Sequence, residues 1–225
     1  MKKILFWLTL ALSVATTASM MTACGTDKDE PKKETPTDPT AKADTTDVGV
    51  IIRGVKWATR NVDAPGTFAK TSKDPGMFYQ WNRKLGWKYS ETLQASDGSS
   101  TWNSSGAAGS TWAKENDPCP CGWRVPTNSE LQSLVSAGSV WSDVSAATLP
   151  GRVFGDGNNS LFLPAAGDRD LSSSTLGGAG LTGYYWSSTV DGAASYYLHF
   201  SSRYVYSANS SLNRAYGLSV RCVAE

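Results

Sequence analysis

Apolar and polar side chains alternate in several short stretches of this chain, and each such stretch predicts a half-buried strand. The first is residues 50–62, where Val55, Trp57 and Thr59 alternate with Lys56 and Arg60. Similar patterns predict further strands at 77–81, 151–155, 161–165, 184–189, 195–206 and 216–223. The turn-forming segment at 156–159, Asp-Gly-Asn-Asn, lies between two of these strands and predicts a hairpin.

One stretch has helical spacing instead. Thr127 and Glu130 are separated as in a capping box, in which each residue satisfies a backbone amide near the other. Leu131 and Leu134 then repeat with the period of a helix, and Gly138 is a residue that can end it in a left-handed conformation. We therefore predict a helix that begins after Thr127 and ends near Gly138.

One clear helix among many strands predicts an α+β domain in which β structure dominates. Two regions show no sustained period. Residues 85–113 mix Trp with Ser, Gly and Asn and predict an irregular insertion, and residues 167–183 are rich in Gly and Ser and predict a long loop. Loops of this length without structure of their own are often functional.

The first residues have the pattern of a targeting segment. Lys2 and Lys3 precede a mostly apolar stretch that is too short to span a membrane, which needs roughly twenty residues. Small residues directly before Cys24 are similar to a bacterial lipobox, in which this cysteine is lipidated; a plain secretory signal with a chance cysteine is the alternative. We expect a lipoprotein signal peptide at 1–23, a disordered tether at 24–47 and one folded domain at 48–225.

Charge narrows the class of partner. The chain of 225 residues carries a formal charge of +1 at pH 7, and removal of the signal segment with Lys2 and Lys3 leaves it close to neutral. Nucleic-acid-binding proteins usually show a basic excess, so we expect no nucleic-acid partner. The chain is instead rich in Trp and Tyr, with nine of each.

Five blocks along the chain resemble the Fibrobacter succinogenes major paralogous domain family. They cover 50–225 in order and are Gly54-Val-Lys-Trp-Ala-Thr-Arg-Asn-Val62, Cys119-Pro-Cys-Gly-Trp-Arg-Val-Pro-Thr127, Leu163-Pro-Ala-Ala-Gly167, Gly183-Tyr-Tyr-Trp-Ser-Ser-Thr189 and Ser219-Val-Arg-Cys-Val223. The resemblance implies a C-type-lectin-like fold, distantly similar to sulfatase-modifying (formylglycine-generating) enzymes. It also implies a secreted or surface-displayed module, of a kind sometimes attached to adhesins and fimbrial tips.

The resemblance also bears on where the protein lies in the cell. Asp27, Asp29 and Glu30, shortly after Cys24, are similar to the export signal of some surface lipoproteins of Bacteroidetes. We therefore expect a cell-envelope protein that is lipid-anchored to the outer membrane and exposed at the cell surface.

The same resemblance favours a disulfide between Cys119 and Cys222, because Cys119 is the position that the family usually occupies. That bridge would leave Cys121 as an odd thiol. A bridge from Cys121 to Cys222, or a role of these cysteines in metal binding or as a reactive thiol, stays open. Oxidising compartments outside the cytoplasm permit such bridges.

We expect no enzymatic activity and no cofactor. Formylglycine-generating enzymes bind copper through two cysteines, whereas a structural bridge here would remove one of the few available. His199, the sole histidine, is expected to point outward from its strand as a solvated side chain. Calcium remains an open alternative because many C-type lectins use it, but no EF-hand loop occurs and the Asp168-Arg-Asp170 segment is better explained as a turn.

Aromatic residues are the stronger candidates for binding. Trp57, Trp81, Trp123 and Trp186 lie in strand-like blocks and are expected in the core. Exposed rings can stack on a sugar or anchor a protein contact, although rings in irregular segments also often cover a core. The candidate ligand contacts, all in polar, irregular or rim-like segments, are Trp87, Trp102, Trp112, Arg169, Arg203, Tyr204 and Tyr206.

We therefore expect a binding or adhesion module, held at the membrane by a lipid anchor, whose partner is a glycan or a protein. The ligand is expected to meet the 167–183 loop, the insertion that contains Trp87 to Trp112, and the rim around Arg203 and Tyr204. A fimbrial or other structural assembly subunit is the alternative, and a formylglycine-generating-type enzyme a more distant one.

Overall fold

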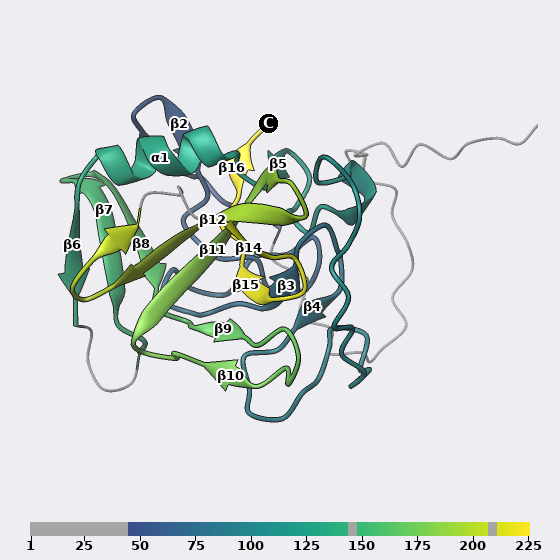
Figure 1. Cartoon of the computed structure of the whole chain (residues 1–225). Helices are drawn as coiled ribbons and strands as arrows, with labels where there is room; N and C mark the ends of the chain where they lie inside the picture. Colours follow the sequence, from purple (N-terminus) through teal and green to yellow (C-terminus); the bar gives the residue numbers. More distant parts are fainter. Residues whose placement is uncertain (1–44, 144–147, 207–210) are drawn as a thin grey trace, which may run out of the picture. The chain divides into compact units, whose positions relative to one another are not determined.

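The computed structural model describes residues 45–143, 148–206 and 211–225. Within these residues the chain forms one α-helix, one 3-10 helix and sixteen strands, which confirms the predicted α+β class with dominant β structure (Figure 1). None of the helices in this part of the chain combines the length and apolar content of a membrane span. The signal segment, Cys24 and the tether up to residue 44 lie outside the described residues.

A four-stranded sheet joins the start of the described chain to its end. Its order is β1 (Val50–Ile52), β2 (Val55–Trp57), β16 (Val223–Ala224) and β5 (Trp123–Arg124). Arg53 and Gly54, both with positive φ, form the two-residue turn between β1 and β2. The first strand pattern is therefore a hairpin whose second strand ends at Trp57, earlier than the alternation suggested.

The central sheet is built around two long strands, β11 (Thr182–Asp191) and β12 (Ala194–Ser201), which pair antiparallel. Along its main path the order is β10 (Leu176–Gly177), β9 (Asp168–Arg169), β15 (Gly217–Ser219), β11, β12 and β13 (Val205–Tyr206). Three short strands complete it, namely β14 (Ser211–Asn213) beside β12, β3 (Phe78–Gln80) beside β15 and β4 (Gly86–Trp87) beside β3. Figure 1 shows β9 and β10 beside one end of β11.

The third sheet contains the predicted hairpin, β7 (Gly151–Asp156) and β8 (Asn159–Pro164), with β6 (Ser139–Ser142) on its outer edge. Gly157 has positive φ in the turn. The predicted helix is α1 (Asn128–Ser136), which packs against β7, β11 and β12 (Figure 1). Both hydrogen bonds of its capping box form, from the Glu130 amide to the Thr127 hydroxyl and from the Thr127 amide to the Glu130 carboxylate.

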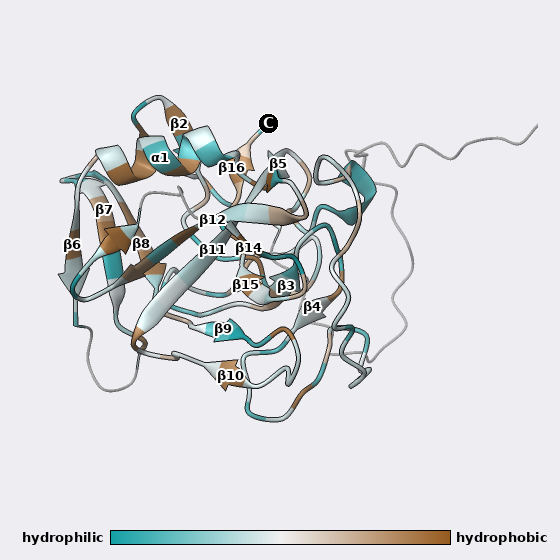
Figure 2. Cartoon of the chain, in the orientation of Figure 1, coloured by the Kyte–Doolittle hydropathy of each residue, from teal (hydrophilic) through white to brown (hydrophobic). Residues whose placement is uncertain are grey.

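The two regions that the sequence predicts to be irregular differ in how much regular structure they contain. The 167–183 loop contains a small hairpin of β9 and β10, closed by a turn at 170–175, so it is more ordered than predicted. The predicted irregular insertion at 85–113 contains one short strand, β4, near its start, its residues 88–113 contain no strand or helix, and a 3-10 helix (Lys114–Asn116) follows. Figure 2 shows that β9 is hydrophilic whereas β10 is hydrophobic.

The core forms three buried clusters rather than one. Trp57, Trp81 and Trp186 are fully buried as predicted, whereas Trp123 is only half-buried. Just ahead of β1, the Asp47 carboxylate accepts hydrogen bonds from the backbone amides of Gly49 and Thr59. Asp47, the last residue of the predicted tether, therefore contacts the folded domain.

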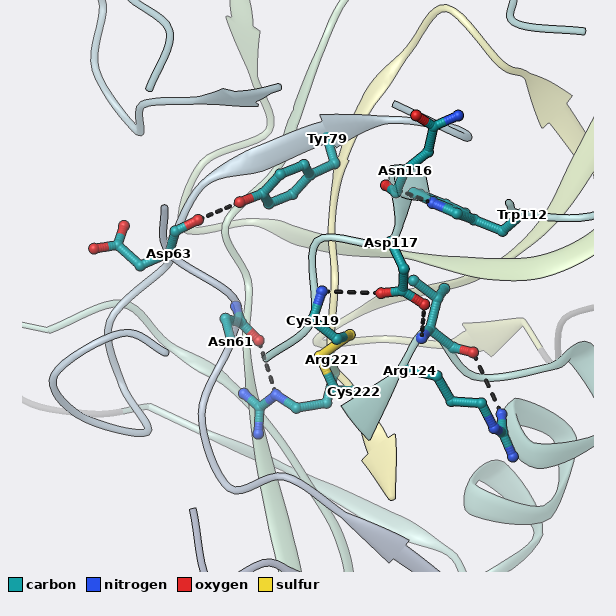
Figure 3. The surroundings of a disulfide bond; sticks show 11 residues. Asn61, Asp63, Tyr79, Trp112, Asn116, Asp117, Cys119, Arg124, Arg221 and Cys222 are labelled. Carbon is teal, nitrogen blue, oxygen red and sulfur yellow. Dashed lines mark hydrogen bonds between the residues drawn. A yellow bond between two sulfur atoms is a disulfide. The ribbon is translucent and has the colours of Figure 1, made fainter. Parts of the chain in front are cut away.

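The disulfide between Cys119 and Cys222 is present, with Cα atoms 6.1 Å apart, as the resemblance implied (Figure 3). It ties the segment before β5 to the segment before β16. Asp117 holds the same segment, because its carboxylate accepts hydrogen bonds from the amides of Cys119 and Val125 (Figure 3). Cys121 is also disulfide-bonded, and none of the cysteines among the described residues is free, so the prediction of an odd thiol at Cys121 is wrong.

Candidate functional site

The two long strands of the central sheet divide their aromatic residues between two faces. Successive side chains of a strand point to opposite faces. Tyr185 and Phe200 accordingly lie in one core cluster, while Tyr184 and His199 face the other side, where they are only half-buried. This second face of the sheet also carries the rings of Tyr197, Tyr204 and Tyr206 beside those of Tyr184 and His199.

Three of these rings form a row across three neighbouring strands. Tyr184 on β11 lies opposite His199 on β12, and His199 lies opposite Tyr206 on β13. The Tyr184 and His199 rings stack with centroids 4.2 Å apart, and the His199 and Tyr206 rings with centroids 5.7 Å apart. Tyr204 extends the row, with its ring 4.7 Å from that of Tyr206. Directly paired aromatic residues of this kind stabilise a sheet.

A pocket of about 380 Å³ lies beside this row. Its walls come from the β9–β10 hairpin, from β11 and β12, and from β14 and the residues directly after it. The lining side chains include four rings and two carboxylates, which are those of Tyr184, Tyr197, His199, Tyr216, Asp168 and Asp170, and Thr175, Gly177 and Leu212 complete it. We call this the tyrosine pocket, and we call Tyr204 and Tyr206 its rim.

The two carboxylates of the pocket are in different states. Burial, together with the nearby charge of Asp170, raises the pKa of Asp168 to about 6. The Asp170 carboxylate instead accepts hydrogen bonds from the amides of Ser172 and Ser173 and from the Ser173 hydroxyl, which lower its pKa. Asp170 therefore organises the turn between β9 and β10, while Asp168 faces the pocket without such support.

His199 differs from the solvated residue that the sequence suggested. It is half-buried between the rings of Tyr184 and Tyr206, and its Nε2 atom is shielded from solvent without a hydrogen-bond partner. Burial lowers its pKa, so the imidazole is neutral at pH 7. The expectation failed because it considered only its own strand, whereas the neighbouring strands bring rings over the imidazole.

Three of the predicted contact residues are buried, and for these the expectation of a surface position is wrong. Trp87 packs against Trp102, and Trp112 packs against Trp81 and donates its indole N–H to the Asn116 carbonyl. Both rings cover the core beneath the irregular insertion.

Arg169 is the third of these buried residues. Its guanidinium is fully buried and donates to the backbone carbonyls of Ser174, Lys88 and Ser90. It links the β9–β10 turn to the insertion, so it holds the scaffold and does not reach the surface.

The other predicted contacts remain accessible to different degrees. Tyr204 and Tyr206 are exposed at 37% and 55%, Arg203 is exposed beside them, and Trp102 is half-buried with its indole N–H donated to the Leu171 carbonyl. The structure thus brings the 167–183 loop and the Tyr204 rim together at one site. The insertion that contains Trp87 and Trp112 does not line the tyrosine pocket.

The sequence did not identify the pocket residues Tyr184, Tyr197, Tyr216 and Asp168 as site residues. A signal was present, because Tyr184 and Tyr197 alternate with core residues on two adjacent predicted strands. Their pairing, however, depends on the register of β11 with β12, which the sequence does not reveal.

Another pocket, of about 470 Å³, lies near β3 and is lined by mixed charges. Asp63 and Asp74 are accompanied there by Lys70 and Lys88, and Tyr89 is its one ring. It lacks the concentrated aromatic surface of the tyrosine pocket. Among the described residues no group of three or more His, Cys, Asp or Glu side chains is placed to hold a metal ion.

Comparison with known proteins places the whole domain in one family. A family model described as the Fibrobacter succinogenes major domain matches residues 7–224, which is nearly the entire chain. The chain belongs to this family. Searches of curated proteins and of solved structures found no significant match, so a C-type-lectin-like fold for this family member stays a prediction.

Proposed function

We propose that this Fibrobacter succinogenes major domain protein is a binding module, and that the tyrosine pocket and its rim contact the ligand. The observation that carries the proposal is the aromatic row of Tyr184, His199 and Tyr206, which remains partly exposed beside a pocket with carboxylates. Solvent-exposed aromatic clusters of this size are uncommon unless they bind something. Ligand pockets typically combine such rings with a few polar groups.

A glycan suits this surface best. The faces of tyrosine rings pack against the C–H groups of a sugar, and phenol hydroxyls and carboxylates exchange hydrogen bonds with its hydroxyl groups. The exposed rim of Tyr204 and Tyr206 would extend contact beyond the single sugar unit that a pocket of about 380 Å³ holds. A protein side chain is the other class of ligand that such rings bind.

Binding is favoured over catalysis by the state of the two carboxylates. A raised pKa on one acid and a lowered pKa on its neighbour is also the pattern of glycoside hydrolases. The Asp170 carboxylate, however, already holds the turn through three hydrogen bonds to Ser172 and Ser173. The lowered pKa of Asp170 is therefore explained by the turn that it organises, and no catalytic role is needed to account for the difference between the two acids.

The sequence supports attachment of this module to the cell envelope, through lipidation at Cys24 and a tether that displays the domain at the outer-membrane surface. Mass spectrometry of the Cys24 peptide from membranes tests this part. A diacylglyceryl group on that cysteine is the expected result. A Cys24 peptide joined by a disulfide to the Cys121 peptide would contradict it, and this is the competing outcome, because Cys24 is the one other cysteine of the sequence once Cys119 and Cys222 are joined.

A glycan array tests the binding function directly. The tag-free full-length chain is compared with the variants Tyr206→Ala and Ile51→Ala. Ile51 is a matched control because it is exposed at 60%, similar to the 55% of Tyr206, but lies in the four-stranded sheet. We expect the wild type and Ile51→Ala to retain the same glycans and Tyr206→Ala to lose them. Retention by Tyr206→Ala equal to the control would contradict the assignment of this surface.

A further inference from the structure

The charges around the tyrosine pocket restrict the chemistry of its ligand, and this inference rests on the binding function proposed above. The pocket is lined by Asp168 and Asp170 but by no lysine or arginine. Arg169, which lies between these two acids in the sequence, directs its guanidinium to three backbone carbonyls of other segments instead. With His199 neutral, no side chain that lines the pocket balances the negative charge.

Asp168 carries the negative charge of the pocket that has no partner. Its side chain is half-buried, and among the described residues its carboxylate accepts no hydrogen bond and forms no ion pair. A carboxylate withdrawn from water without a partner is costly, and proteins normally supply one. The neighbouring Asp170 shows the contrast, because three donors from Ser172 and Ser173 satisfy it. A ligand could supply the partner that Asp168 lacks.

The rings of the pocket surround the same carboxylate. Tyr184, Tyr197 and Tyr216 line the same pocket as Asp168. The Tyr184 and Tyr197 rings are near parallel, with centroids 6.0 Å apart. Tyrosine faces attract cations because the π system is negative, and rings grouped around a carboxylate are a known means of holding an organic ammonium group.

We propose that the tyrosine pocket binds its ligand through an organic ammonium group, which lies against the rings of Tyr184 and Tyr197 and pairs with the carboxylate of Asp168. Two kinds of molecule carry such a group. One is an amino sugar with a free amine, and the other is a choline-type quaternary ammonium. The shared requirement is a positive charge on a small organic group that fits a pocket of about 380 Å³.

Paired probes, in which an uncharged group replaces the ammonium group, test the proposal. Calorimetric titration of the full-length chain compares choline with its uncharged analogue, in which a tert-butyl group replaces the trimethylammonium group, and glucosamine with glucose. We expect at least one charged probe to bind about tenfold or more tightly than its neutral partner, which corresponds to one unit in the logarithm of Kd. Preference for choline or for glucosamine identifies the source of the ammonium group.

Two variants test whether Asp168 causes the preference for the charged probe. Asp168→Asn keeps the size of the side chain and removes its charge, so it is expected to abolish the preference for the charged probe. Asp156→Asn is the matched control, because Asp156 is an exposed acid at the end of β7 and does not line the pocket. If Asp168→Asn and Asp156→Asn both keep the preference for the charged probe, the assignment of the ammonium site to the Asp168 carboxylate is wrong.

The wild type alone provides a second measurement that does not depend on the folding of a variant. The titratable groups that line the pocket are Asp168, Asp170, His199 and the phenols of Tyr184, Tyr197 and Tyr216, and Arg203 is a cation beside the rim. Protonation of either carboxylate or of His199 makes the pocket less negative, so affinity for choline, whose own charge does not depend on pH, is expected to fall as the pH drops from about 7.5 to about 5. Equal affinity at both pH values would overturn the proposal.

The outcomes separate this inference from the binding function on which it rests. If the neutral probes bind as tightly as the charged ones, or if no probe binds while Tyr206→Ala still loses the glycans of the wild type, the ammonium proposal fails and the binding function stands. If Tyr206→Ala retains those glycans, the site itself is wrong.

Discussion

The imidazole of His199 lies parallel to the phenol ring of Tyr184, with ring centroids 4.2 Å apart and planes inclined by 9°. This stack follows from the register of β11 and β12, which places the two residues directly opposite each other. It fixes the sole histidine of the chain at the wall of the tyrosine pocket. The histidine therefore serves as a natural probe of that pocket.

The stack predicts the titration of His199. Burial lowers its pKa, so the imidazole should titrate below its ordinary value of 6.5. Replacement Tyr184→Ala admits water to one face of the ring and should move the pKa back toward that value, whereas Ile51→Ala should leave it unchanged. The NMR chemical shifts of the His199 ring protons, followed against pH, measure this pKa, and because the chain has one histidine no other signal needs to be assigned. A wild-type pKa at or above 6.5 would contradict the buried stack.

The raised pKa of Asp168 predicts that this residue makes the protein less stable as the pH rises. A salt-bridged acid has the opposite effect. Its pKa is about 6 in the folded chain against 3.8 as the reference value, so the folded state binds the proton more tightly than the unfolded state. The free energy of unfolding should therefore fall as the pH rises from about 4 to about 6. Asp168→Asn removes this penalty, with a gain of about 1 kcal/mol at neutral pH after allowance for solvent screening.

Urea denaturation at several pH values checks this prediction. The gain from Asp168→Asn should be present at pH 7 and should vanish near pH 3.5, where the carboxyl is protonated in both states. Asp156→Asn should give no such dependence. A gain of equal size at both pH values would show that the charge of Asp168 is not its cause.

Arg169 should be a structural residue and not a ligand contact. Its buried guanidinium holds the carbonyls of Ser174, Lys88 and Ser90, and Arg169→Met leaves these acceptors without donors. We expect a loss of about 3 kcal/mol in the free energy of unfolding. Faster hydrogen exchange should appear in the β9–β10 hairpin.

Arg203→Met is the control for this substitution, because Arg203 is exposed and should change stability by no more than about 0.5 kcal/mol. Similar losses of the free energy of unfolding in both variants would contradict the claim that the buried hydrogen bonds of Arg169 stabilise the fold.

The disulfide between Cys119 and Cys222 closes a loop with a sequence separation of 103 residues. Chain-entropy arguments give about 4 to 5 kcal/mol of stabilisation for a loop of this size. The double variant Cys119→Ala/Cys222→Ala should lose most of this free energy in urea denaturation. The variant is more informative than a reducing agent, because Cys121 is disulfide-bonded as well. A loss below about 1 kcal/mol would show that other contacts already fix the two segments.

Local signals in the sequence predicted the local elements correctly. The capping box of Thr127 and Glu130 set the start of α1, and the Asp-Gly-Asn-Asn turn set the β7–β8 hairpin. These features depend on residues a few positions apart. The class of the fold followed from the number of such strands.

The site could not be predicted in the same way, because it depends on contacts between distant segments. Trp87 and Trp112 lie in a polar, irregular stretch, yet they are buried because Trp102 and Trp81 pack against them. Arg169 is buried because carbonyls of the insertion surround it. Only the exposed rim of Tyr204 could be proposed from its own surroundings in the sequence.

The most direct test of the tyrosine pocket is the histidine NMR signal of the tag-free full-length chain during addition of each glycan that the array retains. Because His199 is the sole histidine and lines the pocket, its single signal reports on occupancy. We predict that it shifts in a saturable way with the bound glycan. A glycan that binds while this signal stays unmoved would contradict the claim that the tyrosine pocket is the binding site.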